Sequence, residues 1–341
     1  MIGRLPARLV SLVALIASAA CGSSSSTGPS PTPTPTPGNT KFTATGRAVD
    51  ALSQSGYAGI TISGDGLLTS TSDGSGAFTI SSDNSLTDPR LVIFDGPAVV
   101  ERRTNVRVPG QNVSVSLISS GFDLAAFNEM FRSQGALLRW TTAPPLLIET
   151  RALQFTTIGA ADQVALADQM TDAEVAQLID DLTWALPQLT GGRFTAFSSI
   201  TRQTSNEGVS VHILNSGVIT VSRVVGLKAT AGFWGFSRWQ FQPDGTVTAG
   251  MMTLDRDFER SGSPFRRSLN SHELGHGLGY NHVTLRESVM NATGQIEPNA
   301  FDLDACRIGF ARPPGNKSPD ADPTYASLNR VGPAMWSEPI R

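Results

Sequence analysis

Short runs in which apolar and polar residues alternate dominate the chain from about residue 41 to residue 119. The runs are Phe42 to Val49, Gly59 to Ile62, Phe78 to Ile80, Leu91 to Ile93 and Val113 to Ile118. Turn-forming sequences such as Gly-Asp-Gly and Asp-Gly-Pro separate these runs, and no segment repeats its apolar residues every 3.6 positions. The pattern predicts an all-β sandwich of about eighty residues.

The pattern changes after residue 119. Residues 122–131 and 172–189 have helical spacing, and Thr171 with Glu174 has the spacing of a capping box. A third helix is expected to begin at Ser263-Pro264. Between the helices, strand-like runs occupy residues 209–214, 218–225 and 246–254. This mixed order predicts an α+β domain over residues 120–341, so the chain is expected to be multidomain.

The first forty residues have the pattern of an export signal and a tether. Arg4 and Arg8 precede an apolar run that ends near Ala20, and this run is too short to span a bilayer comfortably. Residues 1–20 are therefore expected to be a signal peptide. The following Cys21 completes Ser-Ala-Ala-Cys, which resembles a bacterial lipobox and predicts lipidation, with ordinary cleavage after the small residues as the alternative. The Ser/Thr/Pro-rich residues 22–40 predict an extended linker.

These N-terminal features predict an extracytoplasmic protein. We expect a membrane-anchored lipoprotein that faces the periplasm or the cell exterior, or otherwise a secreted protein. A net charge of -3 gives no broad basic surface, which argues against nucleic acid as a partner. Contact with a membrane is expected only through the lipid at Cys21. The other cysteine, Cys306, is expected to be buried on the apolar side of a short helix.

The residue pattern that carries chemistry lies between residues 272 and 282, where the sequence reads H-E-L-G-H-G-L-G-Y-N-H. On a helix, His272 and His276 project from the same face one turn apart, so both imidazoles can reach one ion. Gly279 can take a positive φ angle, which would end the helix and return the chain so that His282 becomes a third ligand. Three histidines with no fourth Cys or His nearby predict a Zn²⁺ site with an open position, which is typical of catalytic rather than structural zinc.

Glu273 follows the first predicted ligand directly and is the candidate general base. A carboxylate at this position can take a proton from water as the water attacks a carbonyl carbon, and it can then pass the proton to the leaving amine. His212 has no metal-ligand spacing to any other residue and is not expected to belong to the site. The acidic residues of two C-terminal segments are expected to lie in solvated loops rather than in calcium sites: Asp255, Asp257, Glu259, Asp320 and Asp322.

The motif resembles the extended zinc signature H-E-x-x-H-x-x-G-x-x-H of the metzincin metallopeptidases. Ser-Val-Met-Asn at residues 288–291 looks like the Met-turn of that family, which implies that Met290 forms an apolar floor beneath the metal. Met290 lies eight positions after His282, a spacing similar to the matrixin branch. Ala292 stands where astacin-like Met-turns carry a tyrosine, so no tyrosine ligand is implied. The resemblance also implies that the substrate-aligning edge strand lies near residues 246–254.

Residues 41–119 resemble a second family. The sequence TGRAVD…GITISGDG…TSTSDGSGAFTI is similar to carboxypeptidase regulatory-like, transthyretin-like domains of exported proteins. Such a domain could be a folded spacer without chemistry, or it could dock a substrate or a glycan.

The residues and the resemblance together predict an N-terminal all-β sandwich followed by an α+β zincin (metzincin) domain that acts as a zinc endopeptidase on a protein or peptide. Two alternatives stay open. One is a non-catalytic surface lipoprotein that binds peptides, and the other is a zinc amidase that acts on cell-wall peptides.

Overall fold

A computed structural model describes residues 41–84, 86–154, 162–293, 296–324 and 334–340. Residues 41–341 form one compact unit. The predicted signal peptide, the lipobox at Cys21 and the linker lie outside the described residues. Among those that are described, no helix is long and apolar enough to cross a membrane.

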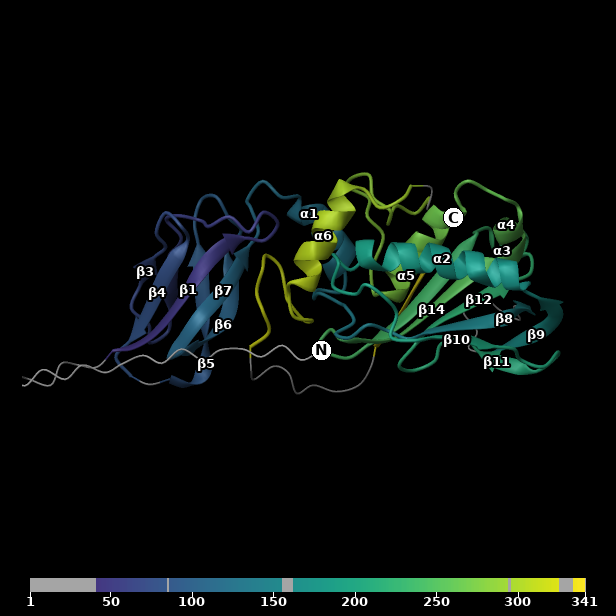
Figure 1. The fold of residues 1–341 in the computed structure, drawn as a ribbon, viewed down its shortest axis with the longest axis horizontal. Coiled ribbons are helices and arrows are strands. Elements are labelled where there is room, and N and C mark those ends of the chain that lie inside the picture. The colour runs from purple at the N-terminus through teal and green to yellow at the C-terminus, as the bar shows by residue number, and fades with distance from the viewer. Residues whose placement is uncertain (1–40, 85, 155–161, 294–295, 325–333, 341) are drawn as a thin grey trace, which may run out of the picture. The chain divides into compact units, whose positions relative to one another are not determined.

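The first part of this unit consists of two β-sheets that share one hydrophobic core (Figure 1). The strands are β1 (Phe42–Asp50), β2 (Thr61–Gly64), β3 (Ser70–Thr71), β4 (Ala77–Ser82), β5 (Leu86–Asp95), β6 (Arg102–Val108) and β7 (Gly110–Leu117). One sheet has the order β4-β1-β7 and the other β3-β2-β5-β6. Phe78 of β4 and Phe94 of β5 meet inside the shared core in an edge-to-face contact, with ring centroids 5.3 Å apart.

The second part is built on an eight-stranded mixed sheet. Its strands are β8 (Leu146–Gln154), β9 (Asp162–Gln169), β10 (Ile200–Gln203), β11 (Ser210–His212), β12 (Ile219–Val224), β13 (Gly235–Phe241), β14 (Val247–Asp255) and β15 (Ala334–Ile340). The strand order is β11-β9-β8-β12-β14-β13-β15, and β10 also pairs with β8. The strands β8, β12 and β14 run parallel, whereas β13 is antiparallel to β14 and β15 is antiparallel to β13.

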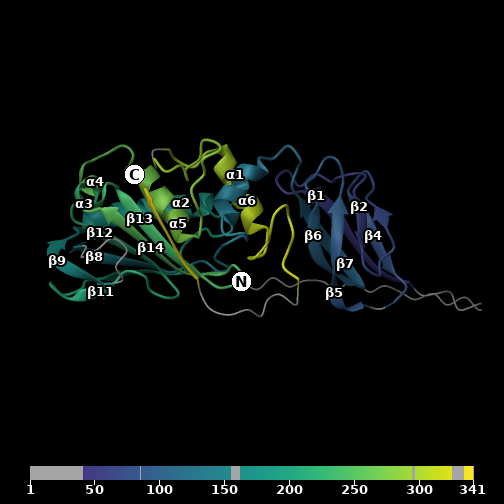
Figure 2. The same cartoon turned by 180° about the vertical axis from the view of Figure 1, so that it is seen from behind.

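The described residues of this second part also form six helices. They are α1 (Leu124–Arg132), α2 (Asp172–Gln188), α3 (Leu227–Ala231), α4 (Arg256–Arg260), α5 (Arg266–Gly277) and α6 (Ala300–Phe310). Figure 1 shows α2 and α5 lying across the strands, and Figure 2 shows the sheet from behind. The helix α5 packs against α2 and also along β13 and β14, so it is held between another helix and the sheet.

Several sequence predictions about individual elements are confirmed. The capping box of Thr171 and Glu174 begins α2, with both reciprocal hydrogen bonds present. Cys306 is fully buried in α6. At a coarse level, the expected combination of several β-sheets with a few helices is also present. The predicted boundary between residues 119 and 120 stays a prediction, although the two hydrophobic cores divide between Leu117 and Ile118.

Two predictions about elements are wrong. The helix that carries the three-histidine motif begins at Arg266 rather than at Ser263-Pro264, because Phe265 is the last residue with non-helical backbone angles. Residues 246–254 do not form an edge strand, because β14 lies between β12 and β13 and pairs with both. The strand β13 was not predicted from its sequence, and it is not an edge strand either, because it lies between β14 and β15.

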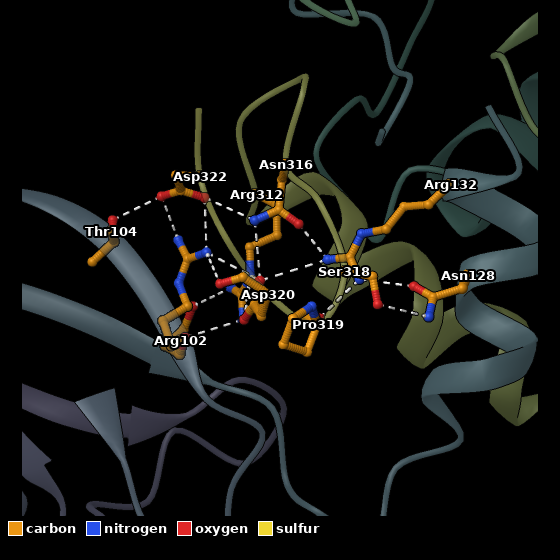
Figure 3. Close-up of polar contacts among 11 residues, drawn as sticks. Arg102, Thr104, Asn128, Arg132, Arg312, Asn316, Ser318, Pro319, Asp320 and Asp322 are labelled. Atoms are coloured by element: carbon orange, nitrogen blue, oxygen red, sulfur yellow. Dashed lines mark hydrogen bonds and ion pairs between the residues drawn. The ribbon is translucent and has the colours of Figure 1, made fainter. Parts of the chain in front are cut away.

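The segment that follows α6 is joined to β6 by a buried network of charges (Figure 3). Asp320 accepts hydrogen bonds from Arg102 at 3.0 Å and from Arg312 at 2.7 Å, and Arg132 lies 3.6 Å away. Asp322 forms a two-point ion pair with Arg102, with both N–O distances at 2.7 Å. Asp320 is fully buried. The expectation that Asp320 lies in a solvated loop is therefore wrong, because three guanidinium groups surround its carboxylate.

Candidate metal centre

The helix α5 and the turn after it bring the three predicted histidine ligands together. His272 and His276 lie one turn apart on α5, and both are fully buried. The helix ends at Gly277, and Gly279 has a φ of +103°. This left-handed backbone, which favours glycine, turns the chain so that His282 returns to the other two histidines. Gly279 thus lies directly after the helix, at the position where the turn was predicted.

The imidazole Nε2 atoms of the three histidines converge on one point. Nε2 of His276 lies 2.9 Å from Nε2 of His272 and 3.3 Å from Nε2 of His282. The three residues form a group whose ligand atoms all lie within 4.8 Å of one another. Two nitrogens bound tetrahedrally at 2.0–2.1 Å from one zinc ion would lie about 3.3 Å apart. The observed spacing therefore fits a tetrahedral ion of this size.

Hydrogen bonds at Nδ1, the ring nitrogen that does not face the other histidines, determine the tautomers of His272 and His276. Nδ1 of His272 lies 2.7 Å from the carbonyl oxygen of Val289, and Nδ1 of His276 lies 2.7 Å from that of Tyr280. Because a carbonyl oxygen can only accept, Nδ1 must carry the proton, and each neutral ring keeps a lone pair on Nε2. Burial lowers the pKa of His272 to about 3, and the neighbouring His282 acts in the same direction. His272 is therefore neutral at pH 7, the form that binds metal.

The residues thus fit a zinc ion on the chemistry of their donor set. Three imidazole nitrogens face one another, and on His272 and His276 these nitrogens carry lone pairs, which are stable side by side only when a cation or a proton lies between them. Among the described residues, His272, His276 and His282 are the His, Cys, Asp or Glu residues whose side chains lie close enough together to hold one metal ion. His212 lies on β11 and is not part of this group.

Glu273 is fully buried and contacts β13. Ser237 donates a short hydrogen bond to Oε2 of Glu273, whereas Oε1 has no hydrogen-bond partner among the described residues. Burial raises the pKa of Glu273 to about 8, and the hydrogen bond from Ser237 acts in the opposite direction. A divalent cation nearby would favour the ionised carboxylate. The arrangement therefore leaves one oxygen of Glu273 available to accept a proton.

One face of β13 packs against α5. A Cβ atom on Gly235 would overlap Oε1 of Glu273, so the strand can approach the carboxylate only because this position lacks a side chain. Two residues further along is Ser237, and two residues beyond it is Trp239, whose indole lies parallel to the His276 ring at 5.6 Å. None of these three residues was predicted from the sequence to belong to the site. Gly235, Ser237 and Trp239 do not form an apolar series, and Phe236 between them is also buried, so no simple alternation of apolar and polar residues marked this strand.

The loop that carries Met290 packs beneath α5. A Cβ atom on Gly275 would overlap the sulfur of Met290, so the thioether lies directly against the helix turn between His272 and His276. Asp302 of α6 fixes this loop by accepting hydrogen bonds from the Val289 N–H at 2.9 Å and the Ser288 hydroxyl at 2.5 Å. Met290 is fully buried, as expected for an apolar floor.

Comparisons with known proteins add no family to this description. No family model and no curated protein matches the chain. One solved structure with a detectable match is "The Bacillus anthracis TIE protein", with 6% sequence identity and a TM-score of 0.18. The match covers 63% of this chain and 42% of that chain, so this chain spans less than half of its length. A TM-score this low carries no argument about fold or function.

Proposed function

We propose that this protein is a zinc-dependent endopeptidase of the metzincin type, whose α+β zincin domain follows a β-sandwich. The observation that carries the proposal is the convergence of the Nε2 atoms of His272, His276 and His282, with the buried Glu273 directly after the first of them in the sequence. Three imidazoles, with no further His, Cys, Asp or Glu in the group among the described residues, are typical of catalytic zinc sites. The resemblance to the metzincin signature supports the same class.

The residues of the chain have separate roles in this proposal. His272, His276 and His282 would hold Zn²⁺, which when bound supplies a Lewis acid that polarises a carbonyl group and makes water more acidic. Glu273 accepts a proton from the attacking water on its free Oε1 and delivers it to the leaving amine. Ser237 holds the other carboxylate oxygen, which keeps Oε1 in one orientation. Trp239 restricts the ring of His276 by lying parallel to it.

A substitution of Glu273 and a chelation experiment test the proposal together. The purified protein should contain about one zinc ion per chain and cleave members of an unbiased peptide library. Glu273→Gln keeps the size of the side chain but removes its basicity, so we expect at least a 10³-fold loss of kcat with zinc content unchanged, of the order that general-base catalysis contributes. Zinc content is read by elemental analysis and cleavage by mass spectrometry.

The control is Glu207→Gln, an exposed glutamate in the turn before β11, which should leave both zinc content and cleavage unchanged. Chelation should abolish cleavage, and added zinc should restore it. Cleavage that survives chelation, or that survives in Glu273→Gln, would disprove the mechanism.

Two other functions predict different outcomes of the same assays. A non-catalytic peptide-binding protein would bind library members without cleaving them, and Glu273→Gln would not change the binding. A zinc amidase of the cell wall would release fragments from purified peptidoglycan while leaving the peptide library intact. We therefore propose that the library and the cell-wall preparation are assayed side by side.

We also propose that the enzyme acts outside the cytoplasm, where a lipid on Cys21 would anchor it and residues 22–40 would hold the folded part away from the membrane. This proposal depends on the sequence of the first forty residues alone.

A further inference from the structure

The strand β13 has two different neighbours, one on each edge. Its inner edge pairs with β14, and the other edge pairs with β15 along the whole strand. The pairing with β15 is antiparallel and runs from Gly235 opposite Ile340 to Phe241 opposite Ala334 without a register shift. The partners are about one hundred residues apart in the sequence, and residues 325–333 connect β15 to the described part of the chain before it.

The strand β13 also contacts two residues of the proposed site. Ser237 donates a hydrogen bond to Glu273, and the Trp239 ring lies parallel to the His276 ring. The middle of β13 therefore lies next to the proposed metal centre. If β15 were removed, this strand would present a row of unpaired backbone N–H and C=O groups beside that centre. An open edge of this kind binds an extended peptide by adding it as a strand, and the main-chain hydrogen bonds do not depend on the peptide's sequence.

We propose that the outer edge of β13 is a binding surface for an extended peptide and that residues 334–340 occupy it as an internal ligand. An incoming substrate strand then competes with β15 for the same backbone groups. Because β15 belongs to the same chain as β13, its effective concentration near the edge is higher than that of a free peptide. This inference rests on the proposed peptidase function for its consequence, the inhibition of cleavage, but not for the binding itself.

The register predicts which backbone groups of β15 matter. Pro339 lies opposite Phe236 and has no N–H group, so this pair is expected to be of the non-hydrogen-bonded kind. Because the two kinds of pair alternate along antiparallel strands, the N–H groups of Trp336 and Glu338 should point toward β13. The N–H group of Ser337 should point away from it.

The first experiment compares the zinc-loaded full chain with a chain that stops after residue 333. We expect the shortened chain to cleave library peptides with at least a 10-fold higher kcat/KM. A synthetic peptide of residues 334–340, added at millimolar concentration, should inhibit the shortened chain competitively. The same peptide methylated on the backbone nitrogen of Trp336 should not inhibit, whereas the matched peptide methylated on the backbone nitrogen of Ser337 should still inhibit. Equal activity of the two chains, or equal inhibition by the two methylated peptides, would overturn the proposal.

A disulfide variant of the full chain tests the same proposal if the shortened chain does not fold. Gln240 lies opposite Met335, in a pair expected to be non-hydrogen-bonded. Gln240→Cys with Met335→Cys should form a disulfide on oxidation, which locks β15 in place and lowers cleavage at least 10-fold until the disulfide is reduced. Met335→Cys alone is the control for oxidation. Failure of the disulfide to form, or full activity of the locked protein, would overturn the proposal.

A binding measurement separates this inference from the proposed function. If neither chain cleaves any peptide, the peptidase proposal fails, and a fluorescent peptide of residues 334–340 is then titrated into both chains. Binding to the shortened chain but not to the full chain supports the internal ligand. Equal binding to both chains, or binding to neither, overturns it.

Discussion

Ser237 contacts the carboxylate of Glu273 from a neighbouring strand rather than from the helix that carries the histidines. It is fully buried, and its hydroxyl also lies 3.3 Å from the backbone carbonyl oxygen of Glu273. Such a hydroxyl can orient the proposed base without touching the substrate. We regard Ser237 as a positioning residue.

Removal of the Ser237 hydroxyl should therefore affect turnover more than binding. Hydrogen bonds to charged groups are worth about 1.5–3 kcal/mol, which corresponds to roughly a 10- to 100-fold change in rate. We expect Ser237→Ala to lower kcat about 10-fold or more, with KM changed less than about twofold and zinc content unchanged. Steady-state kinetics and elemental analysis measure these quantities.

Ser222→Ala is the matched control, because Ser222 is also a buried serine on a strand of the same sheet but has no contact with the site that the structure records. Its kcat should stay within about twofold of the unchanged protein. An equal effect of the two substitutions would mean that Ser237 acts only on the stability of the sheet.

At the level of elements, the helix α5 is fixed on three sides. Its histidines face the turn that follows it, Glu273 faces β13, and Gly275 faces the sulfur of Met290. Two glycines on this helix, Gly275 and Gly277, differ in what a side chain would meet. At Gly275 a Cβ atom would overlap Met290, whereas at Gly277 it would meet Ile219 at 3.4 Å, an ordinary contact.

Gly275→Ala should displace the loop of Met290, and we expect it to lower stability by about 1–3 kcal/mol, as is typical of overpacked cores. Because His272 is hydrogen-bonded to Val289 of the same loop, zinc affinity should fall as well. Urea unfolding and competition with a chelator measure the two effects.

Gly277→Ala is the control on the same helix and should be neutral or slightly stabilising, because alanine favours helix more than glycine does. If Gly275→Ala were as stable and bound zinc as tightly as this control, Met290 would not support the metal centre.

At the level of the whole unit, the Asp320 network joins β6 to the segment that follows α6, and Arg132 of α1 adds a third cation (Figure 3). Burial by itself would raise the pKa of Asp320, but Arg312 and Arg102 outweigh this effect and hold the pKa below its ordinary value. A depressed folded-state pKa contributes stability that is present above the unfolded-state pKa of about 3.9 and is lost as the pH falls below it.

Asp320→Asn should therefore destabilise the protein most at neutral pH. Removal of one partner from a buried ion pair typically costs about 3–5 kcal/mol, because the remaining charges stay buried without compensation. The difference from the unchanged protein should shrink below pH 4, where Asp320 becomes protonated in the unfolded chain and then in the folded one. Urea unfolding at pH 7 and at pH 3.5 measures this dependence.

The control is Asp304→Asn, since the pair of Asp304 with Arg307 is exposed and should contribute less than about 1 kcal/mol. A constant destabilisation by Asp320→Asn across this pH range would show that the carboxylate charge is not what matters.

The local parts of the candidate site could be predicted from the sequence, because they depend on spacing along one segment. Residues four apart on a helix share a face, so His272 and His276 were predicted to converge. A glycine that can take a positive φ ends a helix, and this placed His282. The capping box of α2 and the burial of Cys306 follow from equally local rules.

Tertiary structure alone decided what surrounds these ligands. Ser237, Trp239 and the edge of β13 meet α5 only because distant strands pair in one sheet, and no period within a single segment reveals which strands pair. The pairing of β13 with β15 joins residues about one hundred positions apart, and Asp320 meets Arg102 across 218 positions. A solvated loop and a buried ion pair contain the same residue types, and only the approach of the partner charges distinguishes them. The sequence by itself therefore determined the predicted ligands and base, whereas the folded chain determined which strand holds the base and which segment occupies the edge beside it.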